Sequence, residues 1–390
     1  MRLLKKNTAV LTGLIFIVLL LAATLRFYRL DGQSLWADEG NSVALAGRNL
    51  ADITYGAAYD IHPPLYYYLL HFWIQLFGTS EFAVRSLSAV IGILLVCLTF
   101  LLGRSLFNAW VGLVAAFLSA ISPFQVYYSQ EARMYILLAA LSALSVYFFL
   151  KFVEAEAAGT GRQQSLSLWA GFYILASVLA LYTHYSFPFI LLVENLVYAL
   201  WLAISWRSAG RAGATRPIRR VELVETETKR RGLILRRVLR WAALQLAIVL
   251  LFLRWLPTAY RQVTTWPTPH RAYSLLPTLA DVYRLLCLGL SVETSEVAGA
   301  RIIFAFFILA GSFPAASEAD DQSVSPLQAL PWVLRYSLVV LWAALPTVLI
   351  FALGLFRETH LKFLLVSSPP FSLLVGLGIV NTWRIASDWR

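Results

Sequence analysis

The 390-residue sequence is 59% hydrophobic and 14% aromatic, and only 14% of its residues are charged, so its mean hydropathy is +0.69. Because uncharged runs recur from end to end, this composition excludes a soluble globular domain. The net charge is +11, and we expect the basic residues to face an anionic membrane surface and no nucleic acid. Cys97 and Cys287 lie far apart and form neither a disulfide framework nor a metal knuckle.

The first uncharged run, residues 8–25, predicts a retained membrane helix, because no A-x-A cleavage site follows it and further apolar runs do. Runs of roughly 17 residues or more can cross a bilayer. Glu194 interrupts the run at 186–206, Arg254 lies near the end of the run at 241–256, and the run at 302–313 is short. The ten predicted spans are residues 8–25, 86–102, 109–128, 134–150, 165–182, 186–206, 241–256, 302–313, 336–356 and 363–380.

The aromatic segment 62–78 is the exception, because His71 interrupts it. Residues 207–240 hold eleven Lys and Arg against three Glu, and such a loop stays cytoplasmic, as does the basic N-terminus. An even number of spans must therefore separate the two, and six do so without 62–78. We predict that 26–82 is the first outer loop and that 62–78 lies along the outer membrane face as an interfacial helix.

This parity places the less repetitive polar residues at one outer end of the bundle. They are Asp38 and Glu39 in SLWADEG, His62, Glu131, Arg133 and Tyr135 in SQEARMY, and His184 in THYS. His360 and Lys362 in THLKF join them if residues 302–313 cross the membrane, and otherwise parity puts Lys362 inside. Each has a plainer alternative. Asp38 can be a helix N-cap, Glu131 and Arg133 can be interfacial charges, and Glu194 is best explained by pairing inside the bundle. A functional site is indicated because these polar residues are predicted at the same end of the bundle.

The order of these motifs resembles that of the GT-C membrane glycosyltransferases. The protein mannosyltransferase-like branch, glycosyltransferase family 39, which includes the bacterial aminoarabinose transferase of lipid A, is the most similar. The resemblance is dense over residues 20–200 and rests on LWADEG, HPPLYY, EFAVRSLSAVIG, SQEARMY and LYTHY. Later, RETHLKFLLVSSPPFSLL is similar to a basic-aromatic stretch of the family, with Lys362 and Phe363 where Arg-Tyr is common.

The resemblance implies a sugar donor carried on a polyprenyl phosphate and transfer to a hydroxyl on a lipid, a glycan or a protein. Asp38 matches the family's first-loop acid and is expected to be the general base, with Glu39 orienting it or meeting the substrate. Glu131 is expected to position the acceptor or to share a divalent cation with Asp38. Arg133 and Lys362 are the phosphate candidates. Four further residues are expected to line the site: His62, Tyr135, His184 and His360.

The sequence thus predicts an all-α polytopic membrane protein with one GT-C-type domain over residues 1–390, about ten transmembrane helices and juxtamembrane helices in the first outer loop. We expect it in the cell (inner) membrane with its active site facing the periplasm or outside. The chain stops soon after a span, so a shorter or incomplete member is expected. The alternative is a transporter or flippase of lipid-linked sugars, although transporters place ionisable groups near the middle of their spans.

Overall fold

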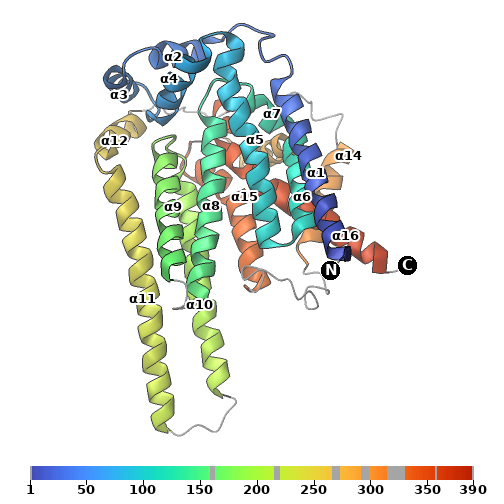
Figure 1. Ribbon diagram of the computed structural model, residues 1–390. Coiled ribbons are helices and arrows are strands. Elements are labelled where there is room, and N and C mark those ends of the chain that lie inside the picture. The colour runs from blue at the N-terminus through green and yellow to red at the C-terminus, as the bar shows by residue number, and fades with distance from the viewer. Residues whose placement is uncertain are drawn as a thin grey trace.

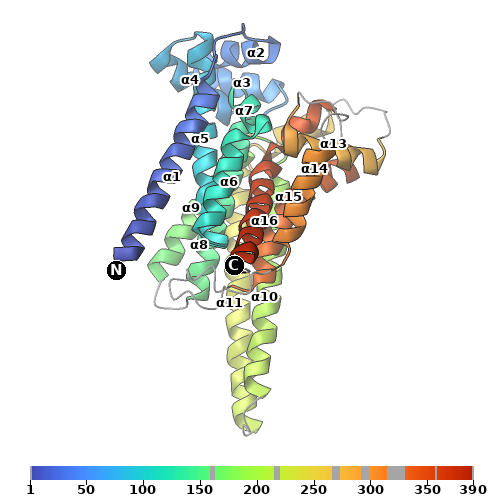
Figure 2. The same cartoon turned by 90° about the vertical axis from the view of Figure 1, so that its right-hand side faces the viewer.

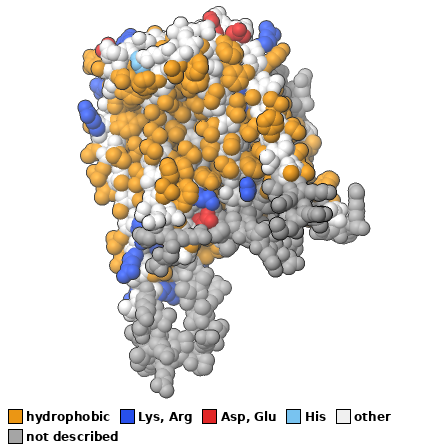
Figure 3. All heavy atoms as spheres, in the orientation of Figure 1, with side chains coloured by type: hydrophobic (Ala, Val, Ile, Leu, Met, Phe, Trp, Pro, Cys, Tyr) orange, Lys and Arg blue, Asp and Glu red, His pale blue; other side chains and the backbone are white. Residues whose placement is uncertain are grey.

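The computed structural model describes residues 2–158, 163–214, 220–265, 273–290, 298–313, 330–355 and 358–388. These residues form helices joined by turns and short loops, and no strand occurs among them (Figure 1). Apolar side chains cover the middle of the face seen in Figure 3, whereas acidic side chains gather at its upper edge. The protein is therefore an all-α polytopic membrane protein, as predicted.

The ten predicted spans all fall on helices. Seven segments in the described part of the chain are long and apolar enough to cross a membrane, or nine if two bent pairs each count as one span. The tenth prediction falls on α14 (Ala298–Gly311), a shorter apolar helix. The straight spans lie in α1 (Arg2–Phe27), α5 (Glu81–Leu106), α8 (Tyr135–Ala157), α9 (Gln163–Leu181), α10 (Pro188–Ala214), α15 (Trp332–Ala352) and α16 (Ser368–Asp388) with the η3 turn (Glu358–Ser367) before it.

One bent pair, α6 (Ala109–Ile121) and α7 (Pro123–Ser129), turns by 60°. Pro123 cannot donate the hydrogen bond that a continuous helix needs, and Arg26 satisfies carbonyls that the break leaves open. Its guanidinium donates to Ser119 O (3.2 Å) and Ala120 O (3.0 Å). The other pair, α11 (Arg220–Phe252) and α12 (Leu256–Thr264), bends by 78°. Both breaks lie at the end of the bundle where the polar motifs emerge (Figures 1 and 2).

Three short helices cover this same end: α2 (Ala37–Ala46), α3 (Leu50–Tyr59) and α4 (Leu65–Phe77) (Figures 1 and 2). They connect the end of α1 to the start of α5, where the sequence predicts an outer loop. With 13 residues, α4 is about 20 Å long, well short of a roughly 30 Å hydrocarbon core. It lies across the bundle end, as expected of a juxtamembrane helix. α13 (Leu275–Leu288) lies at this end as well.

The opposite end carries both marked chain termini and the projecting hairpin of α10 and α11 (Figures 1 and 2). The basic connection predicted at 207–240 is helical in its described part, because α10 continues to Ala214 and α11 begins at Arg220. Arg, Leu, Glu and Lys favour helix, and cation–π contacts join the two helices. The guanidinium of Arg230 lies 3.9 Å from the Trp206 ring centroid, and that of Arg237 lies 4.5 Å from that of Trp201.

Candidate active site

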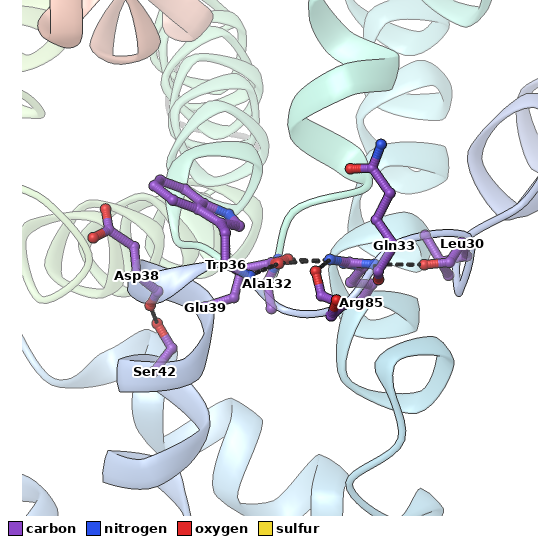
Figure 4. A network of polar contacts seen from close by, with 9 residues as sticks. Leu30, Gln33, Trp36, Asp38, Glu39, Ser42, Arg85 and Ala132 are labelled. Carbon is purple, nitrogen blue, oxygen red and sulfur yellow. Dashed lines mark hydrogen bonds and ion pairs between the residues drawn. The ribbon is translucent and has the colours of Figure 1, made fainter.

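The two adjacent carboxylates of the first turn of α2 point in opposite directions (Figure 4). The helix begins at Ala37 with Trp36 as its N-cap, and Glu39 Oε2 accepts a hydrogen bond from the Trp36 N–H (3.3 Å). The alternative interpretation of Asp38 as the N-cap is therefore wrong. It assumed a helix starting near Gly40, and the cap contact belongs to Glu39 instead.

Glu39 is fully buried and forms a bidentate ion pair with Arg85 of α5, Nε to Oε1 at 2.9 Å and Nη2 to Oε2 at 2.7 Å. Its Oε1 also accepts from the Ala132 N–H (2.8 Å). Arg85 in turn donates to the carbonyls of three residues before α2: Leu30, Gln33 and Ser34. Glu39 thus joins α2, α5 and the turn at 130–134 (Figure 4). This geometry favours the orienting role over direct contact with substrate.

Asp38 faces the other way, and its side chain is 39% exposed. Arg133 Nη2 lies 3.8 Å from its Oδ2, while Nη1 donates to Asp38 O (3.1 Å) and Ser42 Oγ (3.0 Å). The guanidinium is buried and docks on the first turns of α2. Asp38 therefore presents an accessible carboxylate beside a fixed cation.

A second cation, Lys362, lies near Arg133 on the ring of Tyr135, the first residue of α8. This buried ring lies 5.7 Å from the Arg133 guanidinium carbon and 4.8 Å from Lys362 Nζ, measured to the ring centroid. Lys362 belongs to η3, more than 200 residues further along the chain. Two cations from distant segments therefore converge on one aromatic ring.

Two histidines pack against the same ring. The His62 and His184 rings lie 6.3 and 6.2 Å from that of Tyr135 and 5.3 Å from each other, between centroids. Burial, with the nearby charges adding to it, lowers the pKa of His62 well below 6.5 and that of His184 to about 3. Both are neutral at physiological pH, so the positive charge of the cluster comes from Arg133 and Lys362.

Phe363 closes the cluster on the side of η3. Its ring lies 4.4 Å from the His184 ring and 4.8 Å from that of His360, between centroids. His360 Nδ1 is within 2.6 Å of Leu355 O, so this histidine stands at the margin of the site with one nitrogen in use.

Glu131 lies in the turn between α7 and α8 and is only 9% exposed. Burial raises its pKa to about 7, and the Glu39 charge adds to the rise although a hydrogen bond from Tyr127 opposes it. Its Oε2 has no hydrogen-bond partner, and neither does Arg133 Nε or His184 Nε2. Three buried polar atoms without partners at the same end of the bundle indicate that polar ligands bind there.

A divalent cation fits these residues poorly. Within the described ranges, no group of three or more His, Cys, Asp or Glu side chains could hold a metal ion. Asp38 and Glu131 offer carboxylate oxygens, but a bound cation would need substrate oxygens or water for most of its coordination. The cation shared by Asp38 and Glu131 stays a prediction.

Known proteins with a similar sequence or fold were found for this chain. The dolichyl-phosphate-mannose-protein mannosyltransferase family matches residues 61–213, and no curated protein matches the sequence significantly. ArnT of Cupriavidus metallidurans, solved with undecaprenyl phosphate, is similar at a TM-score of 0.55 and 16% identity over 95% of this chain and 60% of its own. The archaeal oligosaccharyltransferase AglB of Archaeoglobus fulgidus, solved with an inhibitory peptide and a dolichol-phosphate, is also similar at a TM-score of 0.55. Its sequence identity is 12%, and the match covers 98% of this chain and 52% of AglB. The chain therefore has the GT-C fold of these two proteins, and its residues 61–213 are similar to the protein mannosyltransferase family.

This GT-C chain spans about 60% of the length of ArnT and about half that of AglB. Among its described residues, the structure brings Asp38, Arg133, Tyr135 and Lys362 together with the two buried histidines, and it holds Glu39 apart in an ion pair. Sequence reasoning missed Arg85, the partner of Glu39. A signal existed, since Arg85 lies in the first two turns of a helix that is otherwise almost uncharged up to Arg104.

Proposed function

We propose that this protein is a membrane glycosyltransferase that moves a sugar from a polyprenyl-phosphate donor to a hydroxyl acceptor. The observation that carries the proposal is the convergence of Arg133 and Lys362 on Tyr135 beside the exposed carboxylate of Asp38. A lipid phosphate needs cations, and an attacking hydroxyl needs a base. The cluster offers both at the end of a membrane bundle, where a lipid can enter laterally.

The residues suggest a single displacement. The acceptor oxygen forms a bond to the anomeric carbon as its proton passes to the Asp38 carboxylate, and the bond from that carbon to the phosphate oxygen breaks. The leaving polyprenyl phosphate gains a negative charge. Arg133 and Lys362 stabilise that charge, and the neutral histidines keep the surroundings poorly hydrated. Glu39, held by Arg85, fixes the turn of α2 that carries Asp38.

The comparisons support a lipid-linked donor. One solved neighbour binds undecaprenyl phosphate and another binds a dolichol-phosphate with a peptide. A donor of this class is consistent with the two cations, since a phosphodiester in hydrocarbon surroundings must be neutralised. The sugar and the acceptor can differ from those of either neighbour.

We place the site on the periplasmic or outer face of the cell (inner) membrane. The support is the basic composition of the α10–α11 hairpin at the opposite end of the bundle, because Lys- and Arg-rich connections stay in the cytoplasm. Single cysteines test this in a Cys97→Ser, Cys287→Ser background. Tyr59→Cys and Leu76→Cys replace side chains that are 69% and 76% exposed, and they should react with an impermeant maleimide from outside. Arg236→Cys in the hairpin should react only after permeabilisation, and the reverse pattern contradicts the orientation.

The transfer itself is tested with radiolabelled polyprenyl-phosphate sugar. The purified protein is reconstituted in liposomes that contain a lipid and glycan extract of the cell envelope. Label that moves to an acceptor supports the enzyme, provided that an Asp38→Asn protein moves none. Label that crosses the bilayer still attached to its polyprenyl phosphate supports the alternative, a flippase of lipid-linked sugars.

A further inference from the structure

A cavity lies beside the cationic cluster, on the Glu39 side of α2. It has a volume of about 570 Å³ and is formed by the end of α1, the segment that precedes α2, and α7. This size lies within the range of small-molecule sites. The residues that define its chemistry are Tyr28, Gln33, Trp36, Tyr127, Gln130 and Glu131. Neither Arg133 nor Lys362 lines it, so the cavity is distinct from the place assigned to the phosphate.

One polar atom in this cavity is without a partner. Glu131 lines the cavity, is more than nine-tenths buried, and its Oε2 accepts no hydrogen bond. A buried carboxylate oxygen in this condition is costly unless a ligand satisfies it. By contrast, Gln130 Nε2 donates to the carbonyls of Leu25, Arg26 and Tyr28 at and just after the end of α1, and Glu39 is held by Arg85. Glu131 is thus the acidic residue lining the cavity whose carboxylate keeps one oxygen, Oε2, without a hydrogen bond.

The remaining walls suit a neutral, hydroxyl-rich ligand. Tyr28, Trp36 and Tyr127 are exposed aromatic residues, and the Gln33 side chain points away from the Glu39–Arg85 pair (Figure 4). Aromatic rings provide apolar faces, while amides and carboxylates bond hydroxyl groups. A phosphate would meet Glu131, and the charged lining residues, Arg29 and Arg85 against Glu39 and Glu131, sum to zero. A sugar unit or another polyol satisfies these walls better than an anion does.

The cavity is coupled to the cationic cluster through one short turn. Glu131 and Arg133 are separated only by Ala132, whose N–H is bonded to Glu39 Oε1 at 2.8 Å. A ligand on Glu131 therefore lies next to the residues that we assign to the donor phosphate. We propose that this cavity binds a sugar or polyol unit of the acceptor other than the one that reacts at Asp38, and that Glu131 accepts a hydrogen bond from one of its hydroxyls. The assignment to the acceptor rests on the proposed glycosyltransferase function, whereas the ligand class does not.

The test blocks the cavity from its rim. Gln33→Cys in the Cys97→Ser, Cys287→Ser background is treated with a small methanethiosulfonate or with a bulky polyethylene glycol maleimide, and Leu50→Cys, on the exposed side of α3, is the matched control. Three quantities are measured in nanodiscs: sugar transfer, binding of undecaprenyl phosphate and of undecaprenyl phosphate glucose, and saturation-transfer signals from a mixture of methyl glycosides.

The bulky label on Gln33→Cys should lower transfer at least tenfold and remove the methyl glycoside signals, while both lipids bind within twofold of the unlabelled protein. The small reagent and the labelled control should change little. Glu131→Gln should raise the KM for acceptor more than it lowers kcat. Unchanged transfer and unchanged glycoside signals overturn the proposal. Selective loss of undecaprenyl phosphate glucose binding also overturns it, because the cavity would then hold the donor sugar.

The two proposals fail separately in this design. If the wild-type protein transfers no sugar but its methyl glycoside signals disappear on blocking Gln33→Cys, the hydroxyl-binding cavity stands and the glycosyltransferase function falls. If the wild-type protein transfers sugar but gives no glycoside signals, the cavity assignment falls and the enzyme stands.

Discussion

Two buried polar clusters in this bundle differ in how completely their atoms are paired. In the middle of the spans, Glu194 receives hydrogen bonds on both oxygens, from Ser145 Oγ (2.8 Å) and Tyr173 OH (3.0 Å). The network continues through Gln245 to Asn195. At the bundle end, Glu131 Oε2, Arg133 Nε and His184 Nε2 have no partners. The first cluster is complete without a ligand, and the second is not.

The difference separates two reasons for placing polar groups in a membrane protein. A satisfied network holds helices together at little cost. Buried groups without partners reduce stability, so their presence indicates a function that needs them. Glu194 is the most conspicuous ionisable residue within the predicted spans, and its contacts show a structural role. The site lies where the sequence is less apolar, among residues that are individually ordinary.

The largest effect is expected at Asp38. Asp38→Asn keeps the size of the side chain but removes proton acceptance, so turnover should fall roughly 10²–10⁴-fold, while undecaprenyl phosphate binding stays near that of the wild type. Steady-state transfer and a lipid titration measure the two. If the Asp38→Asn protein folds and turns over normally, Asp38 has no part in the mechanism.

Glu39→Gln should act on stability more than on chemistry. The substitution leaves the buried Arg85 guanidinium without its counter-charge, and breaking a buried ion pair in this way costs about 3–5 kcal/mol. Thermal unfolding in detergent measures the loss. Turnover per folded molecule should fall far less than in the Asp38 variant, and an equal fall would assign Glu39 to the substrate.

Glu131→Gln should stabilise the protein at neutral pH. The folded-state pKa of Glu131 is about 7 against an ordinary 4.5, so folding favours the protonated form. Its stability contribution is complete below pH 4.5 and is lost as the pH rises to 7. The variant escapes this loss, which is on the order of 3 kcal/mol at most. Its melting temperature should exceed that of the wild type at pH 8, and the two should converge below pH 4.5. An unchanged difference across this range would show that the Glu131 carboxyl is not shifted.

Arg133→Ala should weaken undecaprenyl phosphate binding by about 10–100-fold, since a charge-assisted hydrogen bond is lost. Arg133→Lys should lose less, because it keeps the charge but not the planar fork. Ser42→Ala is the matched control, as it removes one hydrogen bond that holds the guanidinium and leaves the charge in place. Equal affinity in all three variants would mean that another group binds the phosphate.

The smallest effect is expected at Glu194. Glu194→Gln retains an acceptor for Ser145 and Tyr173, so turnover should stay within about twofold and stability within about 1 kcal/mol. Transfer assays and thermal unfolding under the same conditions check both. A large loss of transfer with normal stability would place Glu194 in the mechanism and remove the contrast between the two clusters.

The amino-acid sequence alone determined the membrane character and the helical segments, and it named most of the residues of the candidate site. These properties follow from the hydropathy and charge of single segments. Hydropathy over one segment predicts whether it is buried in a bilayer, and the balance of Lys and Arg around it favours one orientation. The order of the short motifs added the GT-C resemblance.

Only the tertiary structure showed how the residues of the candidate site are arranged. Asp38 and Glu39 are neighbours in sequence, yet one is half-exposed beside Arg133 and the other is buried against Arg85, because the first turn of α2 directs them to opposite sides. The approach of Lys362 to Tyr135 and the cavity beside Glu131 depend on packing between segments far apart in the chain. The extension of α10 to Ala214 and the start of α11 at Arg220 depend on contacts between these two helices. Such contacts are absent from any local pattern, since each is set by how whole helices dock.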